Sequence, residues 1–142
     1  MKIIWICSPG EAEYDLYVAC KEAGIDFELY CVDEGHLFGA NINYTTIESR
    51  HVGAVIDCCA ADMYVLRYPQ THWSRAQDQS KVVCFNSEYG ATRQWAEASS
   101  LPYKNIGVTH HLDVKYYKEK YPHKKVIYFP WGASKSDIDY QA

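Results

Sequence analysis

A cluster of polar side chains stands at the end of the apolar run KVVCFNS, residues 81–87. Asn86, Ser87 and Glu88 bring an amide, a hydroxyl and a carboxylate together in three consecutive positions. These groups suit hydrogen bonding to a ligand rich in hydroxyls, and Glu88 could act as a general base on one of them. The same residues also fit a solvated loop in which Asn86 or Ser87 caps the following helix. The pattern leaves both interpretations open.

A second candidate loop, SPGE, follows the apolar stretch KIIWIC near the N-terminus. It lacks the glycines of a G-x-G-x-x-G fingerprint, so the sequence does not predict a dinucleotide site there. Gly10 would let a ligand approach the backbone closely, beside the Ser8 hydroxyl. Glu11, at the expected start of a helix, suits the helix dipole and would repel a phosphate. The alternative is an ordinary strand-to-helix turn.

Two further groups have chemistry that the sequence alone does not assign. His110, followed directly by His111, is a candidate substrate contact or proton carrier, and a contact at a helix N-terminus or a surface position is the alternative. Arg67 lies within the run DMYVLRYP, where one face of the expected strand must accept its charge. It either pairs with an acid or reaches the ligand crevice.

The six cysteines could indicate a disulfide framework or a metal site. No C-x-x-C pair occurs, and adjacent Cys58 and Cys59 would point to opposite faces of an expected strand. The histidines are scattered as well. We therefore expect six reduced thiols that serve as small apolar residues, with no metal and no cofactor.

The elements that must position these residues alternate between strands and helices. Leu16, Ala19, Cys20 and Ala23 form a helical stripe that Gly24 would cap. The segment 33–52 is the hardest to interpret, and TTIESRH within it could be a short helix from Thr45 or Thr46. The remaining pattern predicts strands at 2–7, 26–32, 53–59, 62–69, 81–87, 105–110 and 125–130, and helices at 12–23, 71–79, 91–99 and 112–121.

Several expected strands, such as GAVIDCC at 53–59, are apolar throughout and do not alternate. Such strands are typical of a parallel sheet that is covered on both faces. The sequence therefore predicts a three-layer, Rossmann-like α/β domain with about six or seven mostly parallel strands, and with strand 2–7 near the centre. In such a sheet ligands bind at the carboxyl ends of the strands, where all the candidate loops above begin.

Bulk composition narrows the class of protein further. A chain of 142 residues suits one domain, and a 48% apolar content argues against disorder. The net charge is −4 with dispersed Lys and Arg, so we expect no nucleic-acid binding. No apolar run reaches the ~20 residues of a membrane span, and the stretch after Lys2 is too short for a signal peptide. These features predict a soluble, cytoplasmic protein.

One segment carries a more specific pattern, NIGVTHHLDVKYYKEKYPHKKVIYFPWGAS at 105–134. A strand ends in small polar residues, a helix rich in Lys, Tyr and Glu follows, and a second strand closes in Pro130-Trp131-Gly132. This order resembles the end of the N-terminal domain in retaining, family-4-like GT-B glycosyltransferases. The stretch MKIIWICSPG is similar to the first strand and loop of that family, and the resemblance covers the whole chain in element order. Pro9-Gly10 stands where the family has two adjacent glycines, and Asn86-Ser87-Glu88 replaces its usual acceptor-side residues.

The resemblance implies that residues 1–142 form one Rossmann-like domain, the acceptor side of a transferase that uses a nucleotide-sugar donor. In the family, Pro-x-Gly leads into a second, donor-binding domain, which this chain does not contain. We therefore expect an N-terminal domain that binds a sugar or other hydroxyl acceptor and is inactive until a second domain or subunit completes it. The expected catalytic residue is Glu88, and the expected substrate contacts are Ser8, Gly10, Glu11, Asn86, Ser87 and His110.

An alternative from another class is a stand-alone Rossmann-like protein that binds a small nucleotide or sugar and self-associates. Flavodoxin-like and response-regulator-like modules fit less well, because SPGEAE and CCAAD supply neither a phosphate-binding loop nor a phosphoacceptor aspartate.

Overall fold

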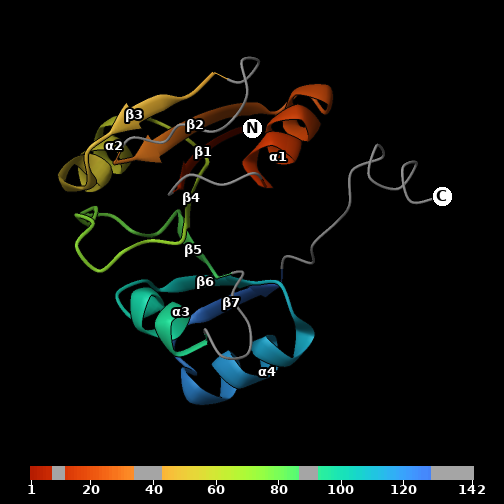
Figure 1. Cartoon of the computed structure of the whole chain (residues 1–142). Coiled ribbons are helices and arrows are strands. Elements are labelled where there is room, and N and C mark those ends of the chain that lie inside the picture. Colours follow the sequence, from red (N-terminus) through yellow and green to blue (C-terminus); the bar gives the residue numbers. More distant parts are fainter. Residues whose placement is uncertain (8–11, 34–42, 87–92, 129–142) are drawn as a thin grey trace.

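The structure, a computed structural model, describes residues 1–7, 12–33, 43–86 and 93–128 (Figure 1). Its strands are β1 (Lys2–Cys7), β2 (Asp26–Val32), β3 (Thr45–Ile47), β4 (Met63–Arg67), β5 (Val82–Asn86), β6 (Asn105–Val108) and β7 (Lys125–Tyr128). Its α-helices are α1 (Ala12–Glu22), α2 (Val52–Cys58), α3 (Arg93–Ser100) and α4 (His111–Lys120), and a short 3₁₀ helix, η1, spans Ser49–His51.

The described strands form one parallel sheet in the order β3-β2-β1-β4-β5-β6-β7. The central strand is β4, and β1 is its neighbour, so the prediction of a parallel sheet with strand 2–7 near the centre is confirmed. The chain builds the sheet outward from β1 to β3 and then crosses back to β4. Adjacent β1 and β4 therefore form the topological switch point, where sheets of this kind bind ligands.

Helices cover both faces of the sheet (Figure 1). On one face Tyr17 of α1 packs with Phe27, Leu29 and Cys31. On the other, α2 contributes Val52 to the largest described core cluster, while Tyr117 of α4 packs on β6. The three-layer, Rossmann-like prediction is thus confirmed. Gly24 follows α1 at φ 72°, as expected of a helix C-terminal glycine.

The predicted strand at 53–59 is wrong, because this segment forms α2. Val52, Gly53 and Ile56 are its buried residues, a helical spacing that a short apolar run does not distinguish from a strand. Gly53 has a packing role here, since an added Cβ would lie 2.4 Å from the Arg75 carbonyl oxygen. The Cys58 and Cys59 side chains consequently do not alternate across a strand. All six cysteines are free thiols.

The predicted helix at 71–79 is also wrong, since the described chain there is a turn and an irregular loop. Tertiary partners take the backbone groups that a helix would have used: Ser74 N–H donates to the Ser49 carbonyl oxygen over 3.0 Å, and Gln77 N–H donates to the Asp57 carboxylate over 3.1 Å. Buried Trp73 anchors the loop in the core.

Strand β3 comes from the segment 33–52, which the sequence left ambiguous. Thr45–Ile47 pairs with the end of β2 as edge strand β3, and η1 follows, so no helix starts at Thr45 or Thr46. β-branched residues at all three positions favour this extended form.

Candidate functional site

The carboxyl ends of the strands define the candidate site, but much of the predicted rim lies outside the described residues. Ser8, Gly10, Glu11, Ser87 and the proposed base Glu88 all belong to this group. Asn86 is described as the last residue of β5, beside Val108 of β6. It therefore stands at the carboxyl edge, as predicted.

His110 also lies at this edge, two residues beyond β6, and it is the N-cap of α4. Its Nδ1 accepts a hydrogen bond from the Leu112 N–H over 3.2 Å, and its ring stacks on His111 with 4.6 Å between centroids. This is the structural role weighed above for the histidine pair. Because Nδ1 accepts, the proton of the neutral ring resides on Nε2, which could donate to a ligand.

The switch point itself holds a buried cation, Arg67. It ends β4 opposite Cys7 of β1 and Phe85 of β5 and is 7% exposed. Its guanidinium carbon lies 4.4 Å from the centroid of the Tyr68 ring, a cation–π arrangement. The sequence did not decide whether Arg67 pairs with an acid or reaches the ligand crevice. The structure places it at the carboxyl end of the central strand.

The backbone at Tyr68 is strained, with φ at 55°. A left-handed conformation is rare for a bulky residue and is concentrated at functional positions. Gln70 Nε2 donates to the Tyr68 carbonyl oxygen over 3.3 Å, which holds the turn. The chain therefore reverses sharply after β4 and keeps Arg67 and Tyr68 in contact.

A second left-handed residue, Asp33, follows β2 with φ at 57°. Its Oδ1 accepts a hydrogen bond from the Ser49 N–H over 3.3 Å, and its Oδ2 lies 3.7 Å from Nε2 of His72. This Asp33–His72 pair joins the loop after β2 to the loop after β4, so it spans the end of β1 between them. Both side chains are more than half exposed and can reach a ligand.

Sequence reasoning missed His72, because a helix was expected at 71–79. The available signal was Pro69, which together with Gln70 and Thr71 fits a loop after β4 as well as a helix start.

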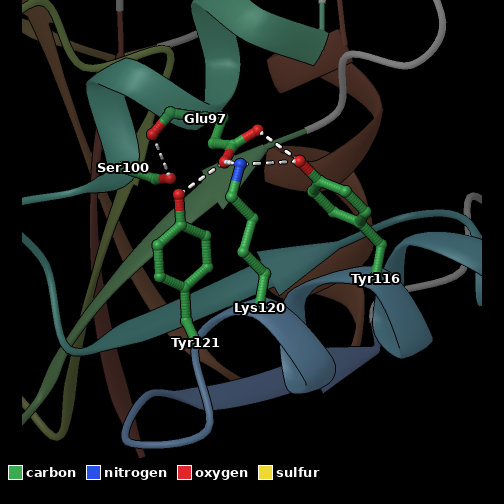
Figure 2. A network of polar contacts seen from close by, with 5 residues as sticks. All are labelled: Glu97, Ser100, Tyr116, Lys120 and Tyr121. Atoms are coloured by element: carbon green, nitrogen blue, oxygen red, sulfur yellow. Dashed lines mark hydrogen bonds and ion pairs between the residues drawn. The ribbon is translucent and has the colours of Figure 1, made fainter.

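A different polar cluster joins α3 to α4 (Figure 2). Glu97 of α3 is at its centre and has a side chain only 11% exposed. Its Oε2 accepts from the Tyr116 hydroxyl over 2.8 Å, and its Oε1 accepts from the Tyr121 hydroxyl and the Lys120 ammonium, each over 2.5 Å. The Lys120 ammonium also donates to the Tyr116 hydroxyl over 3.1 Å. We call these four residues the Glu97 network.

The pKa shifts within the Glu97 network indicate that its role is structural. Burial acts to raise the pKa of the Glu97 carboxyl, but the three hydrogen bonds that it accepts hold that pKa below its usual value. The Glu97 carboxylate in turn raises the pKa of the Lys120 ammonium. Burial, followed by the hydrogen bond to Glu97, raises the pKa of Tyr121. These shifts hold Glu97, Lys120 and Tyr121 in their ordinary charge states near neutral pH, which is the reverse of an activated base or nucleophile.

A groove of about 370 Å³ lies beside the outer edge of β2, away from the switch point. Its lining includes Tyr17 of α1, Phe27 and Leu29 of β2, and Tyr44 just before β3. Most of these groups are aromatic or aliphatic, and the candidate residues at the carboxyl edge do not line it.

Residues 1–7, 12–33, 43–86 and 93–128 contain neither a cluster of metal-binding side chains nor a helix that could span a membrane. No group of three or more His, Cys, Asp or Glu residues there is arranged to hold a metal ion. No helix within those ranges is long and apolar enough to cross a bilayer.

The site therefore rests on its own geometry: a buried Arg67 stacked on Tyr68 at the switch point, an accessible Asp33–His72 pair beside it, and Asn86 and His110 farther along the same edge. A scan of protein-family models and searches of curated proteins and solved structures found no match to this chain.

Proposed function

We propose that this chain is the acceptor-side domain of a cytoplasmic GT-B glycosyltransferase that uses a nucleotide-sugar donor. The observation that carries the proposal is the switch point between β1 and β4, where Arg67, Tyr68 and the Asp33–His72 pair gather at the carboxyl edge. Edges of this kind bind ligands in open parallel sheets. The resemblance of residues 105–134 to the family supplies the choice of transferase, and its strand–helix–strand order agrees with β6, α4 and β7.

The accessible groups suit a ligand that carries several hydroxyls. The Asp33 carboxylate accepts hydrogen bonds, and a carboxylate makes stronger ones than a neutral acceptor. Asn86, whose side chain carries an amide, ends β5 at the same edge, and His110 caps α4 there. Arg67, at the end of the central strand, carries a positive charge at the same edge of the sheet.

In the proposed reaction one acceptor hydroxyl forms a bond to the anomeric carbon of the donor sugar. The bond from that carbon to the phosphate oxygen breaks, and the nucleoside diphosphate leaves. The hydroxyl proton passes to a base, the role proposed for Glu88, or to the leaving phosphate. Binding both substrates in one cleft makes the step effectively unimolecular, so the donor-binding domain is required for turnover.

Replacing Glu88 by Gln in the enzyme completed by its donor domain tests the catalytic part of the proposal. The substitution keeps the shape and removes the base, so turnover should fall on the order of 100-fold while the free energy of unfolding changes by no more than about 0.5 kcal/mol. Full activity of Glu88→Gln would reduce Glu88 to a loop residue.

The chain by itself separates the proposal from the alternative of a stand-alone binding protein. We expect it to release no nucleotide from UDP-glucose faster than buffer does, and to bind sugars weakly, because under the proposal a second domain supplies the other half of the cleft. Sugar transfer at an enzymatic rate by the 142 residues alone would overturn the half-enzyme proposal. Tight binding of a nucleotide or sugar, without transfer in any complex, would establish the binding protein instead.

A further inference from the structure

The charges of this chain are distributed unevenly along its length. Residues 1–80 hold twelve Asp and Glu against five Lys and Arg, whereas the segment from Lys104 to Lys125 holds six lysines, no arginine and two acids. One of those acids, Asp113, is 3% exposed. The β6–α4–β7 unit is thus a basic region on an acidic chain.

Two turns at the amino end of the sheet bring part of this basic region together. The turn before β6 and the turn before β7 are neighbours, because the Lys124 ammonium donates to the carbonyl oxygens of Leu101 and Tyr103 over 2.8 and 2.6 Å. The Lys125 N–H also donates to the Lys104 carbonyl oxygen over 3.0 Å. Their exposed residues form what we call the amino-edge patch: Leu101, Pro102, Lys104, Pro122, His123 and Lys125.

Not every lysine near this edge is available to a partner. The Lys120 ammonium is bound in the Glu97 network, and the Lys124 ammonium is held by the two turn carbonyls. Lys104 and Lys125 are exposed at the edge, and exposed Lys81 lies near Lys104, since the charges of both act on Asp78. Asp78 is the acid whose pKa is lowered here, first by its hydrogen bonds with Ser80 and further by the charges of Lys81 and Lys104.

Apolar groups accompany these charges. Leu101 is 49% exposed, and Pro102 and Pro122 are exposed beside it. An apolar tip on the same two turns as exposed lysines matches a membrane interface, where the tip enters the headgroup boundary and the lysine stems extend toward the phosphates. Lysine alone suits a diffuse anionic surface, whereas recognition of individual phosphates in nucleic acid favours the arginine fork.

We propose that the amino-edge patch docks this domain onto a lipid bilayer that contains anionic lipids. The patch lies at the opposite end of the strands from the candidate site, so docking leaves the carboxyl edge open. Each lysine near an anionic bilayer contributes about a five-fold gain in membrane partitioning. The interaction is therefore expected to weaken as salt is added.

Sedimentation with lipid vesicles tests the proposal. The chain should pellet with vesicles of phosphatidylcholine mixed with phosphatidylglycerol, and not with vesicles of phosphatidylcholine alone. The double variant Lys104→Glu/Lys125→Glu should lower the partition coefficient at least ten-fold. Leu101→Ser, which leaves the charge intact, should lower it several-fold by removing the apolar tip.

A matched control changes the same total charge elsewhere. Lys21→Glu/Arg50→Glu removes two exposed cations, one at the end of α1 and one in η1, and should reduce binding much less than the patch variant. Thermal melts should show that all the variants fold. Equal losses for the two double variants, no pelleting with anionic vesicles, or binding to an oligonucleotide in preference to vesicles would each overturn the proposal.

Discussion

The carboxylates of Glu97 and Asp33 differ in how deeply they are buried and in how many hydrogen-bond partners they have. Glu97 is 11% exposed and accepts hydrogen bonds from two tyrosines and a lysine, whereas the Asp33 side chain is 54% exposed and has one backbone donor and a histidine at 3.7 Å. The first is saturated with partners between two helices. Asp33 lies at a strained turn beside the switch point, and its carboxylate can accept further hydrogen bonds. The denser polar cluster therefore stabilises the fold, and the sparser one is the better candidate for a ligand site.

The largest effect should come from breaking the Glu97 network. Glu97→Ala leaves two tyrosine hydroxyls and an ammonium without their acceptor, so the free energy of unfolding should fall by about 2–3 kcal/mol in chemical denaturation. Glu119→Ala in α4 is the control, because Glu119 is exposed and lies 4.0 Å from Lys115. Its cost should stay below about 0.5 kcal/mol. Equal costs for the two variants would show that Glu97 is not a structural centre.

The pH dependence of the free energy of unfolding should reveal the contribution of the Glu97 network. The folded pKa of Glu97 lies below its unfolded value, so its contribution is present above about pH 4.3 and is lost as pH falls through the folded pKa. The folded pKa of Lys120 is raised, so its contribution is present below about pH 10.4 and is lost as pH rises through the folded pKa. The stability difference between wild type and Glu97→Gln should therefore be largest between these limits. A difference that is constant from pH 3 to pH 7 would contradict this assignment.

The smallest effect on stability should come from Asp33→Asn. Asn tolerates the left-handed backbone and keeps the shape, so the free energy of unfolding should change by less than about 0.5 kcal/mol. Affinity for a sugar acceptor should nevertheless fall about ten-fold, because a charged acceptor is lost. Asp26→Asn, an exposed change at the opposite end of β2, should leave that affinity unchanged. If both variants bind sugar equally well, Asp33 is not part of the site.

The sequence predicted most of the fold because its signals were local. Continuous apolar strands such as Lys2–Cys7 indicated the parallel sheet, although the apolar run at 53–59 that also suggested it forms α2. Gly24 marked the end of α1. The errors fall between β2 and β5, where the chain crosses back over the sheet. There Gly53 allows α2 to pack against the 71–80 loop, and Trp73 anchors that loop without a helix. Both arrangements depend on contacts distant in sequence, which a window of a few residues does not contain.

The candidate site could be predicted less completely for a related reason. Asn86 and His110 were found at the carboxyl edge because each follows a clear strand. His72 reaches Asp33 only because β2, β1 and β4 are adjacent in the sheet, which is a property of topology. Arg67 was visible in the sequence, but its stacking on Tyr68 depends on the left-handed turn that follows β4.

The most direct test of the central claim is to map sugar binding onto the backbone amides by ¹H–¹⁵N NMR. The chain would be titrated with glucose, N-acetylglucosamine and lactose, and separately with UDP-glucose. We expect saturable shifts from at least one sugar at Asp33, Tyr68, His72 and His110, and none at Lys104 and Lys125 on the opposite edge. Saturable shifts confined to the groove beside β2 or to the amino-edge patch, or no saturable shift with any of these ligands, would contradict a ligand site at the carboxyl edge of the sheet.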